Sequence, residues 1–592
     1  MLYENAINVL YIDLTTSKIE IKRRTDLAGY LGGVGVASKL LYETMRSELP
    51  LLAPEQPIVM AIGAISGIYP LITKTVAMFI SPLTGEMGES YAGGRLALTL
   101  SMAGYDAVVI HGKAPRPSYI AINGENIEIK DARPIWGMDS DAVGQFLRDH
   151  EQGGGKRSIL RIGPAGEKLV KFASVCVDTY RHFGRLGLGA VMGSKHVKAI
   201  IVTGNKTTKI NDFKNYFRVY QTIFKSVTGT DLMAKYHDLG TAINVEPINA
   251  LGALPTNNLT ASHFDDAGQI SGEAFAKNNL VRKMACTGCP VGCIHIGQFR
   301  REFDKGYEYE AVSVGYDYEL IYSLGSLLGV SKTDEILHLI EAVEKTGMDA
   351  ISAGVALAWA TESLMKGIVT EAETLLPLDF GDSENYYKAI MYLANRENTF
   401  YKVLGEGTRF AGATFGGKEF ALQVAGNEIP GYHTGYGNLV GLTVGARHSH
   451  LCNGGYAVDQ SMTTFDENKA VDTLFNEELE RCLVNSLVIC LFARKVYNRE
   501  TVLKALTAVG YTLTDSDLTT IAKRIYTTKL RIKEKLGFDP RQVKLPKRFF
   551  EAPSIHGTLD PSIAERMINR YVEKCALLLA EAPSIPLTPP AI

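Results

Sequence analysis

The sequence predicts an α+β protein, with a β-rich N-terminal third followed by two mainly helical parts. Up to about residue 208, short apolar runs such as AVVIHG (107–112) alternate with turn signals, as strands do. Beyond that point apolar residues recur at helical spacing. We therefore expect three domains, at residues 1–208, 209–425 and 426–592.

Two hairpins are predicted in the β-rich part. NVLYIDL (8–14) and KIEIKRR (18–24) flank a polar turn, and SYIAINGENIEIK (118–130) has Asn123-Gly124 at its expected tip. Glycine-rich segments interrupt the strands, and glycine reaches 57 of 592 residues. Glycine lets the backbone approach a ligand closely, so this excess favours a large buried cofactor, although tight turns explain it equally well.

The second part begins the helical pattern. EILHLIEAVEKTG (335–347) follows a capping signal at Ser331–Asp334 and ends at Gly347. AISAGVALAWATESLMK (350–366) ends at Gly367 in the same way, and each helix is expected to bury one apolar stripe.

Composition excludes several classes of protein. The net charge is −2 and the pI about 6.7, so the chain lacks the basic surface of a nucleic-acid-binding protein. The N-terminus lacks the pattern of a signal peptide, and the apolar run CLVNSLVICLFA (482–493) is too short to cross a bilayer. The eight cysteines do not resemble a disulfide framework, so we expect a cytoplasmic, reducing location.

The densest chemical cluster is CTGCPVGC, which places Cys286, Cys289 and Cys293 within eight residues. Three thiolates from one short loop suit a [4Fe–4S] cluster. A structural zinc site is the alternative, with His295 as its fourth ligand. The pattern alone does not choose a fourth cluster ligand among the remaining cysteines, which are Cys176, Cys452, Cys482, Cys490 and Cys575.

Several spaced motifs together resemble the tungsten-containing aldehyde ferredoxin oxidoreductase family, up to about residue 555. Besides the cysteine motif they are SPLTG…AGG…AGYDAVVIHGKA (81–114), IGPAGE (162–167), GRLGLGAVMGSKHVKAI (184–200), YELIYSLGS (318–326), TGMDAISAG (346–354) and LPKR (545–548). Each is weak alone, and their order and spacing are specific.

The resemblance implies a bis-tungstopterin cofactor, in which the dithiolene sulfurs of two pterins hold tungsten, or molybdenum in its place, with Mg²⁺ bridging the pterin phosphates. It also implies a [4Fe–4S] cluster nearby. The first domain would cradle the pterins, the second would carry the cysteine motif and an active-site Glu, and the third a histidine motif and the fourth cysteine. Residues matching one pterin-contact segment are Lys74, Tyr91, Ala92 and Gly93, and those matching another are Arg181, His182, Gly184 and Arg185.

Two further pterin signatures of the family match this chain with changes. The first falls on Glu344, Met348 and Asp349, and the second on Asn485, Ile489 and Cys490, which the match makes the fourth cluster ligand. Glu344 and Asn485 stand where the family has Asp. An amide has one acceptor oxygen where a carboxylate has two, so the second pterin is expected to be held differently. Tyr91 replaces a usual Asn, and GYHTGYG (431–437) replaces a usual Asp-Pro-Arg-Gly turn.

The resemblance places Glu319 on the family's active-site glutamate, with Glu308 and Glu310 as competitors in a similar stretch. ARHSHL (446–451) matches a region in which Arg447 would contact a pterin and His450 would be the active-site histidine. His448 is the alternative under a shifted gap. His-x-His is also a metal-chelating pattern. The spacer between Cys293 and Glu319 is a few residues longer than usual, which is where substrate specificity is expected to diverge.

The predicted activity is oxidation of an aldehyde to a carboxylic acid, with electrons leaving through the cluster to ferredoxin or a partner iron–sulfur subunit. Alternatives are a class II benzoyl-CoA reductase-type catalytic subunit and a non-catalytic iron–sulfur electron-transfer subunit. The resemblance also implies a homodimer or membership of a larger electron-transfer complex. No nucleic acid, membrane span, flavin or nicotinamide signature is expected.

Overall fold

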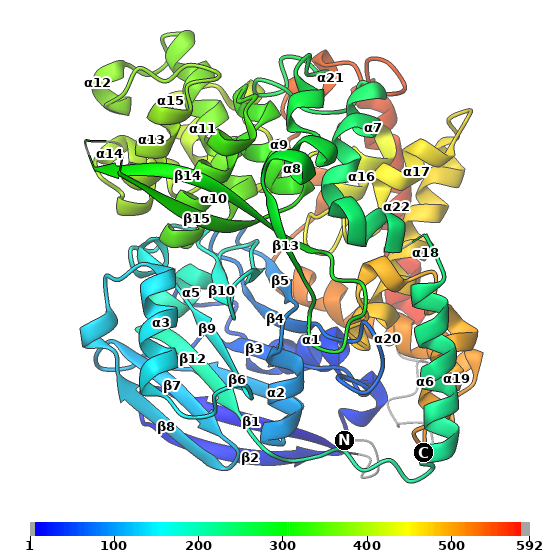
Figure 1. Ribbon diagram of the computed structural model, residues 1–592. Coiled ribbons are helices and arrows are strands. Elements are labelled where there is room, and N and C mark those ends of the chain that lie inside the picture. Colours follow the sequence, from blue (N-terminus) through cyan, green and yellow to red (C-terminus); the bar gives the residue numbers. More distant parts are fainter. Residues whose placement is uncertain (1–5, 232, 305, 307, 582–592) are drawn as a thin grey trace.

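Two six-stranded sheets form the N-terminal part of the computed structural model, which describes residues 6–231, 233–304, 306 and 308–581 (Figure 1). The first sheet has the order β2-β1-β6-β3-β4-β5 and the second β11-β10-β9-β12-β7-β8. Their strands are β1 (Ile7–Asp13), β2 (Lys18–Arg24), β3 (Ile58–Ala61), β4 (Thr75–Ile80), β5 (Met87–Ala92), β6 (Ala107–His111), β7 (Ser118–Asn123), β8 (Asn126–Asp131), β9 (Arg157–Arg161), β10 (Val175–Val177), β11 (Arg181–Phe183) and β12 (Val197–Thr203).

The two faces of the first sheet contribute to different hydrophobic cores, because successive side chains of a strand point to opposite faces. Val9 belongs to a core shared with helices of the C-terminal part, whereas Leu10 belongs to a core shared with the second sheet. The helices of this region are α1 (Gly33–Thr44), α2 (Leu96–Ala103), α3 (Ser140–His150), α4 (Pro164–Glu167) and α5 (Leu188–Ser194).

Both predicted hairpins are confirmed. β1 pairs antiparallel with β2, and β7 with β8. In the second hairpin Asn123 pairs with Asn126, so the turn residues are Gly124 and Glu125 and the predicted tip is one residue early.

The middle of the chain combines helices with one three-stranded sheet, β13-β14-β15, that follows the cysteine motif. Its strands are β13 (Leu280–Met284), β14 (Ile294–Asp304) and β15 (Glu308–Tyr316); its helices are α6 (Phe213–Thr228), α7 (Val245–Ala250), α8 (Gly272–Asn278), α9 (Tyr318–Leu324), α10 (Thr333–Thr346), α11 (Ala350–Met365), α12 (Glu371–Thr374), α13 (Ser383–Asn395), α14 (Thr399–Leu404) and α15 (Thr408–Phe415).

The last part is helical, apart from the short pair β16 (Gln423–Val424) and β17 (Asn427–Glu428), as predicted. Its helices run along the outer edge of the molecule and back across the sheets (Figure 1). They are α16 (Tyr436–Val444), α17 (Gly455–Ser461), α18 (Glu467–Ser486), α19 (Arg499–Thr507), α20 (Asp515–Lys535), α21 (Arg548–Glu551) and α22 (Pro561–Glu581). The described helices include none long and apolar enough to cross a membrane.

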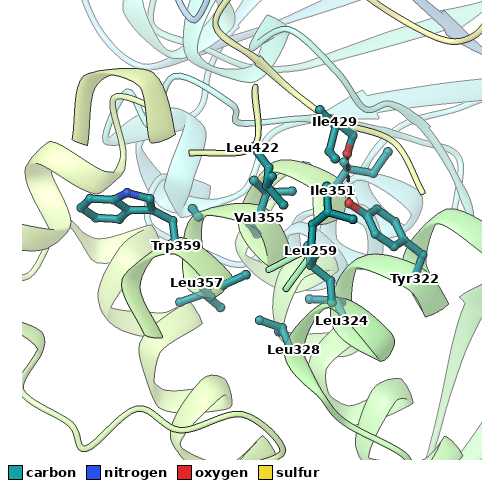
Figure 2. Close-up of a cluster of buried hydrophobic side chains, with 14 of the residues drawn as sticks. Leu259, Tyr322, Leu324, Leu328, Ile351, Val355, Leu357, Trp359, Leu422 and Ile429 are labelled. Atoms are coloured by element: carbon teal, nitrogen blue, oxygen red, sulfur yellow. Dashed lines mark hydrogen bonds between the residues drawn. The ribbon is translucent and has the colours of Figure 1, made fainter. Parts of the chain in front are cut away.

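Helix α11 departs from its predicted single apolar stripe, because residues from Ile351 to Ser363 are buried on all sides of the helix. Figure 2 shows its Val355, Leu357 and Trp359 side chains within a core that includes Tyr322 of α9. The Tyr322 hydroxyl donates a hydrogen bond of 3.3 Å to the carbonyl of Ile429. This core fixes α9, whose first turn carries Glu319.

Candidate active site

Four cysteines from two distant parts of the chain meet beside the first sheet. Cys286, Cys289 and Cys293 come from the loop between β13 and β14, and Cys490 follows α18. Backbone contacts bring Cys490 there, since its amide donates to the Leu71 carbonyl at 2.9 Å. Burial, followed by the neighbouring thiols, raises the pKa of Cys289 to about 12 and that of Cys293 to about 11. Cys490, from the C-terminal part of the chain, is therefore the fourth thiol near the loop that carries Cys286, Cys289 and Cys293.

The remaining cysteines and His295 lie differently. Cys176, Cys452 and Cys482 are buried in cores, and Cys575 lies on α22 near the Tyr526 hydroxyl. The Nε2 atom of His295 lies 3.0 Å from the His237 carbonyl. Among the described residues no three His, Cys, Asp or Glu side chains converge on a position for a single metal ion. The geometry thus gives the zinc alternative no support at His295.

A glycine turn after β5 presses against the cysteine loop. A Cβ atom on Gly93 would lie 2.6 Å from the Cys286 sulfur and 3.3 Å from Lys74 Nζ, so only glycine fits without a shift. Thr287 N also donates to the Gly94 carbonyl at 3.1 Å. Burial favours the neutral Cys286 thiol, but Lys74 and Arg181 outweigh it and hold the pKa below its ordinary value. Lys74, Arg181 and the turn at Gly93 therefore lie between Cys286 and the strands of the N-terminal part.

Glu319 is held at the start of α9 by local capping. The Asp317 side chain accepts from the amides of Glu319 and Leu320, at 3.1 and 3.3 Å, which fixes the first turn. The Gly431 amide donates to Glu319 Oε2 at 3.0 Å. Burial, partly opposed by this bond, raises the pKa of Glu319 to about 8. Its competitors differ, since Glu308 and Glu310 are exposed on β15 and Glu310 pairs with Arg301.

His450 lies against this carboxylate, with its Nε2 atom 3.4 Å from Glu319 Oε1. Burial, and then Arg185 and Arg447, lower the pKa of His450 well below its ordinary value, so the imidazole is neutral at pH 7.

His448 points elsewhere. Its backbone adopts a left-handed φ of 53°. Its Nδ1 lies 2.9 Å from the Leu442 carbonyl, and its Nε2 lies 3.1 Å from Glu86 Oε1 and 3.3 Å from Lys533 Nζ. Both ring nitrogens of His448 are therefore engaged within the protein.

Arg185 connects the second pterin-contact segment to the histidine loop. Its Nε atom lies 2.8 Å from Asp349 Oδ2, and its Nη2 donates to Asn427 Oδ1 at 2.6 Å. The Asn427 amide in turn donates to the His448 carbonyl at 2.9 Å. Asp349 also caps α11 by accepting from the amides of Ile351 and Ser352. One arginine therefore fixes α11 and the loop before His450.

Arg447 sits in a buried charge network beneath the same loop. Its Nη1 donates to the Glu89 carbonyl at 3.1 Å, and its guanidinium lies 4.8 Å from the centre of the Tyr91 ring. The Glu89 carboxylate accepts from Tyr91 at 2.8 Å and pairs with Lys529 at 2.7 Å. These partners balance charges that would otherwise be costly to bury.

The other predicted pterin residues are mostly buried. Burial, with Asp141 nearby, raises the pKa of Glu344 to about 8. Burial and Arg181 lower the pKa of His182 to about 3. A Cβ on Gly184 would meet no atom within 4 Å. The remaining predicted residues are also buried: Ala92, Met348, Asn485 and Ile489.

Three buried polar atoms at the site test whether a polar cofactor fits. Glu319 Oε1, His450 Nδ1 and Arg447 Nε have no hydrogen-bond partner among the described residues. Buried polar atoms normally find partners. With the cations Lys74 and Arg181, they match the polar edges and anionic phosphates of a pterin cofactor, and the four thiols match an iron–sulfur cluster.

Sequence reasoning missed an aromatic wall around His450. The Tyr432 ring lies 5.2 Å from the His450 ring, 4.6 Å from Tyr456 and 5.0 Å from Tyr318. Tyr432 and Gly431 belong to the GYHTGYG segment, whose departure from the family pattern was the available signal. Tyr456 gave none, because only the fold brings it there.

Comparisons with known proteins agree with this arrangement. A curated tungsten-containing aldehyde ferredoxin oxidoreductase from Pyrococcus furiosus is 33% identical over 583 residues, covering 94% of this chain and 93% of that protein. One from Thermococcus kodakarensis is 31% identical and covers 96% of each. The WOR-like subunit of an aliphatic sulfonate oxidoreductase from Pyrococcus furiosus is 27% identical over 82% of this chain and 79% of that protein.

A solved structure shares the fold at 19% identity. It is the active site complex BamBC of benzoyl coenzyme A reductase with 1,5 dienoyl-CoA, with a TM-score of 0.83 over 96% of this chain and 95% of that chain.

These similarities show that the chain is an oxidoreductase. Family models identify the family. The N-terminal domain of aldehyde ferredoxin oxidoreductase matches residues 9–204, and domains 2 and 3 match residues 218–575. The chain therefore belongs to the aldehyde ferredoxin oxidoreductase family.

Proposed function

We propose that this protein oxidises an aldehyde to a carboxylic acid with a bis-tungstopterin cofactor and passes the electrons to an iron–sulfur acceptor through a [4Fe–4S] cluster. The contact between Glu319 and His450, 3.4 Å apart in a buried site, carries the proposal. A carboxylate next to a neutral imidazole can handle the proton that such an oxidation releases.

The cofactors would be held by groups already described. Lys74, Arg181 and Arg447 would bind pterin phosphates or edges, and Glu344 and Asn485 would face pterin N–H groups. Cys286, Cys289, Cys293 and Cys490 would hold the cluster. When bound, the tungsten centre supplies the two-electron chemistry, with molybdenum as its possible substitute and Mg²⁺ as a bridge between pterin phosphates.

The chain's own groups would then handle water and protons. The Gly431 amide, at 3.0 Å, holds one oxygen of Glu319 and leaves the other directed to His450. In its ionised form Glu319 can orient the attacking water and take its proton. The neutral imidazole of His450 can donate or accept a hydrogen bond beside it. His448 would support the loop rather than touch the substrate.

The aromatic wall suggests the class of aldehyde. The rings of Tyr432 and Tyr456 lie 5.2 and 5.8 Å from the imidazole of His450, and Tyr318 packs against Tyr432 at 5.0 Å. Aromatic neighbours of this kind favour apolar and aromatic groups. We therefore expect an aldehyde with an aromatic or bulky apolar substituent. This expectation is independent of the spacer before Glu319, whose extra residues lie in the β14–β15 hairpin.

Anaerobic purification followed by analysis for W, Mo, Fe and Zn tests the cofactors. The proposal predicts tungsten or molybdenum together with about four iron atoms per chain. Iron without either metal would favour the non-catalytic electron-transfer subunit.

Turnover with a viologen dye tests the reaction. Benzaldehyde should be oxidised with a lower KM than acetaldehyde. The benzoyl-CoA reductase-type alternative, which has only the shared fold in its favour, predicts no aldehyde turnover and instead viologen-linked chemistry on an aromatic thioester. A cytoplasmic location, a homodimer and the three domain boundaries stay predictions.

A further inference from the structure

An aromatic ridge runs along α6, at the outer edge of the molecule beside α19 (Figure 1). Phe213, Phe217 and Phe224 are 62%, 45% and 39% exposed. Phe213 stacks on Phe217 at 6.0 Å and Tyr220 on Phe224 at 6.2 Å, and Tyr216 joins the two pairs through contacts with Phe213 and Tyr220. Water-exposed phenylalanines in one row are costly on a protein that works alone, and such patches often mark binding surfaces.

The ridge leads inward to the cysteine cluster. Tyr216 of α6 packs 5.2 Å from Tyr69, and its hydroxyl donates to the Ile68 carbonyl at 2.6 Å. Buried Tyr497 belongs to the hydrophobic core against which Tyr216, Tyr220 and Cys289 pack. A short path of rings therefore separates the outer face of α6 from one cluster thiol.

A second aromatic pair covers the other side of the cluster. Tyr236 and Phe492 stack with their centroids 4.1 Å apart and their planes 10° apart. Tyr236 lies within electrostatic range of Cys293 and Cys490, and Phe492 follows Cys490 by two residues. Both rings are partly exposed. The thiols are thus close to solvent on the side flanked by residues 491–499.

The same side of the molecule carries unbalanced positive charge. Helix α6 contains three basic residues and no acidic residue. A cleft of about 560 Å³ is lined by Arg494 and Lys495 and also by Glu477 and Glu480. These two carboxylates pair with Arg481 and Arg499, which leaves Arg494 and Lys495 unbalanced. Among the described residues, six cations of this region have no carboxylate partner within ion-pair distance: Lys214, Arg218, Lys225, Lys235, Arg494 and Lys495.

We propose that α6, the turn bearing Tyr236 and residues 491–499 form the docking surface for the electron acceptor, a small acidic iron–sulfur protein. The inference rests on the proposed function, because it assigns the partner of the same cluster. At each encounter one electron leaves the cluster and reduces the oxidised cluster of the partner. Two encounters follow each two-electron turnover, and no bond or proton is exchanged. Opposite charge steers the encounter, and the aromatic ridge excludes water from the contact.

A charge-reversal pair tests the electrostatic part on the anaerobically purified holoenzyme. Lys225→Glu with Lys495→Glu changes two exposed side chains that form no ion pair with any described residue. Lys388→Glu with Lys402→Glu makes the same charge change on α13 and α14, in the distant helical layer. The probe is a purified acidic ferredoxin with two [4Fe–4S] clusters.

The first pair should raise the Kd for ferredoxin, measured calorimetrically, and the ferredoxin KM by about tenfold or more at low salt. The control pair should change neither by more than about twofold, because its charges lie beyond the Debye length of the surface. Dye-linked turnover should stay the same in both, since a small dye needs no docking surface. Added salt should weaken wild-type binding and affect the first pair little.

A second comparison tests the ridge. Phe217→Ser should raise the Kd for ferredoxin several-fold, whereas Phe303→Ser, which changes a more exposed phenylalanine on β14, should not. Unchanged binding in both Lys225→Glu/Lys495→Glu and Phe217→Ser, equal weakening in the controls, or no ferredoxin binding by the wild type would overturn the docking surface. Loss of aldehyde turnover with the dye in the wild type would instead overturn the proposed function, because the Kd does not depend on turnover.

Discussion

At the scale of single residues, the site depends on one buried carboxylate. Glu319→Gln keeps the shape and the Gly431 contact but removes the group that can take a proton. General acid–base catalysis typically contributes about 10²- to 10⁴-fold, so we expect kcat to fall at least about 100-fold with unchanged metal content. Dye-linked kinetics and elemental analysis measure the two quantities.

The matched control is Glu310→Gln, which alters the competing carboxylate on β15, an exposed partner of Arg301. A surface ion pair of this kind contributes little to stability, so kcat should stay near the wild-type value. If Glu310→Gln abolished turnover and Glu319→Gln did not, the assignment of the active-site glutamate would be reversed.

The raised pKa of Glu319 predicts a pH dependence. Its ordinary value is 4.5, and burial raises it to about 8. A base must be ionised, so kcat/KM should rise with pH and level off above about 8, and this limb should be missing in Glu319→Gln. The effect on stability has the opposite sign. Between pH 4.5 and 8 the unfolded chain binds fewer protons at Glu319 than the folded chain does. The free energy of unfolding therefore decreases as the pH rises from 4.5 to 8.

The two histidines show what a sequence leaves open at this scale. His448 and His450 are two residues apart, and a one-residue gap exchanges their roles in the family match. The left-handed backbone of His448, with φ at 53°, and its contacts with Glu86 and Lys533 separate them. Glu86 lies directly before β5 and Lys533 lies on α20, so only the tertiary fold supplies the distinction.

At the scale of elements, α11 is fixed by its cap and its burial. Asp349→Ala removes the N-cap, worth roughly 1 kcal/mol, and leaves Arg185 without its carboxylate partner, which costs about 3 to 5 kcal/mol for a buried pair. We expect a clearly lower melting temperature and reduced pterin content. Calorimetry and pterin fluorescence after denaturation measure both.

Asp382→Ala is the control, because Asp382 caps α13 by accepting from the Asn385 amide and pairs with no arginine. It should lower the melting temperature only slightly, in line with loss of a cap alone. Equal shifts in the two variants would show that the Arg185 contact adds nothing to the cap.

Local sequence patterns predicted the presence of helices better than they predicted where the helices begin and end or how deeply they are buried. Helix α10 ends at Gly347 as expected, because the left-handed conformation at the C-cap favours glycine. Its start differs: the N-cap is Lys332, which makes no side-chain capping bond, so the predicted capping signal at Ser331–Asp334 is wrong. The burial of α11 on all sides was not predicted. The spacing of apolar residues indicates only one buried face of a helix, and the burial of the other faces depends on tertiary contacts.

At the scale of the whole molecule, the site joins segments far apart in the chain. Glu319 meets Gly431 across 112 residues, and Arg185 meets Asn427 across 242. The cysteine spacing and the two hairpins were visible in the sequence because they are local. The aromatic wall and the buried network under Arg447 were not, because no short pattern encodes such distances.

The fourth cysteine tests this long-range assembly most directly. Leu71 binds the Cys490 amide, and Ile72 forms a β-bridge with Ile489, so the cluster would tie the first sheet, the 286–293 loop and the C-terminal helices together. A [4Fe–4S] cluster needs four protein ligands, so Cys490→Ser should lose at least about half of its iron and change the spin signal of the reduced protein. A group that binds only the folded state stabilises it, so the melting temperature should fall as well.

Cys575→Ser provides the comparison, because this half-buried thiol lies on α22 near the Tyr526 hydroxyl, where a serine hydroxyl can take its place. Iron content, spin signal and melting temperature should stay close to the wild-type values. The assignment of Cys490 fails if Cys490→Ser retains full iron and an unchanged signal. Loss of iron in both variants would point to general instability. Loss in Cys490→Ser alone would place the C-terminal part of the chain at the cluster, where it would order the groups that hold the pterins and the docking surface proposed for the electron acceptor.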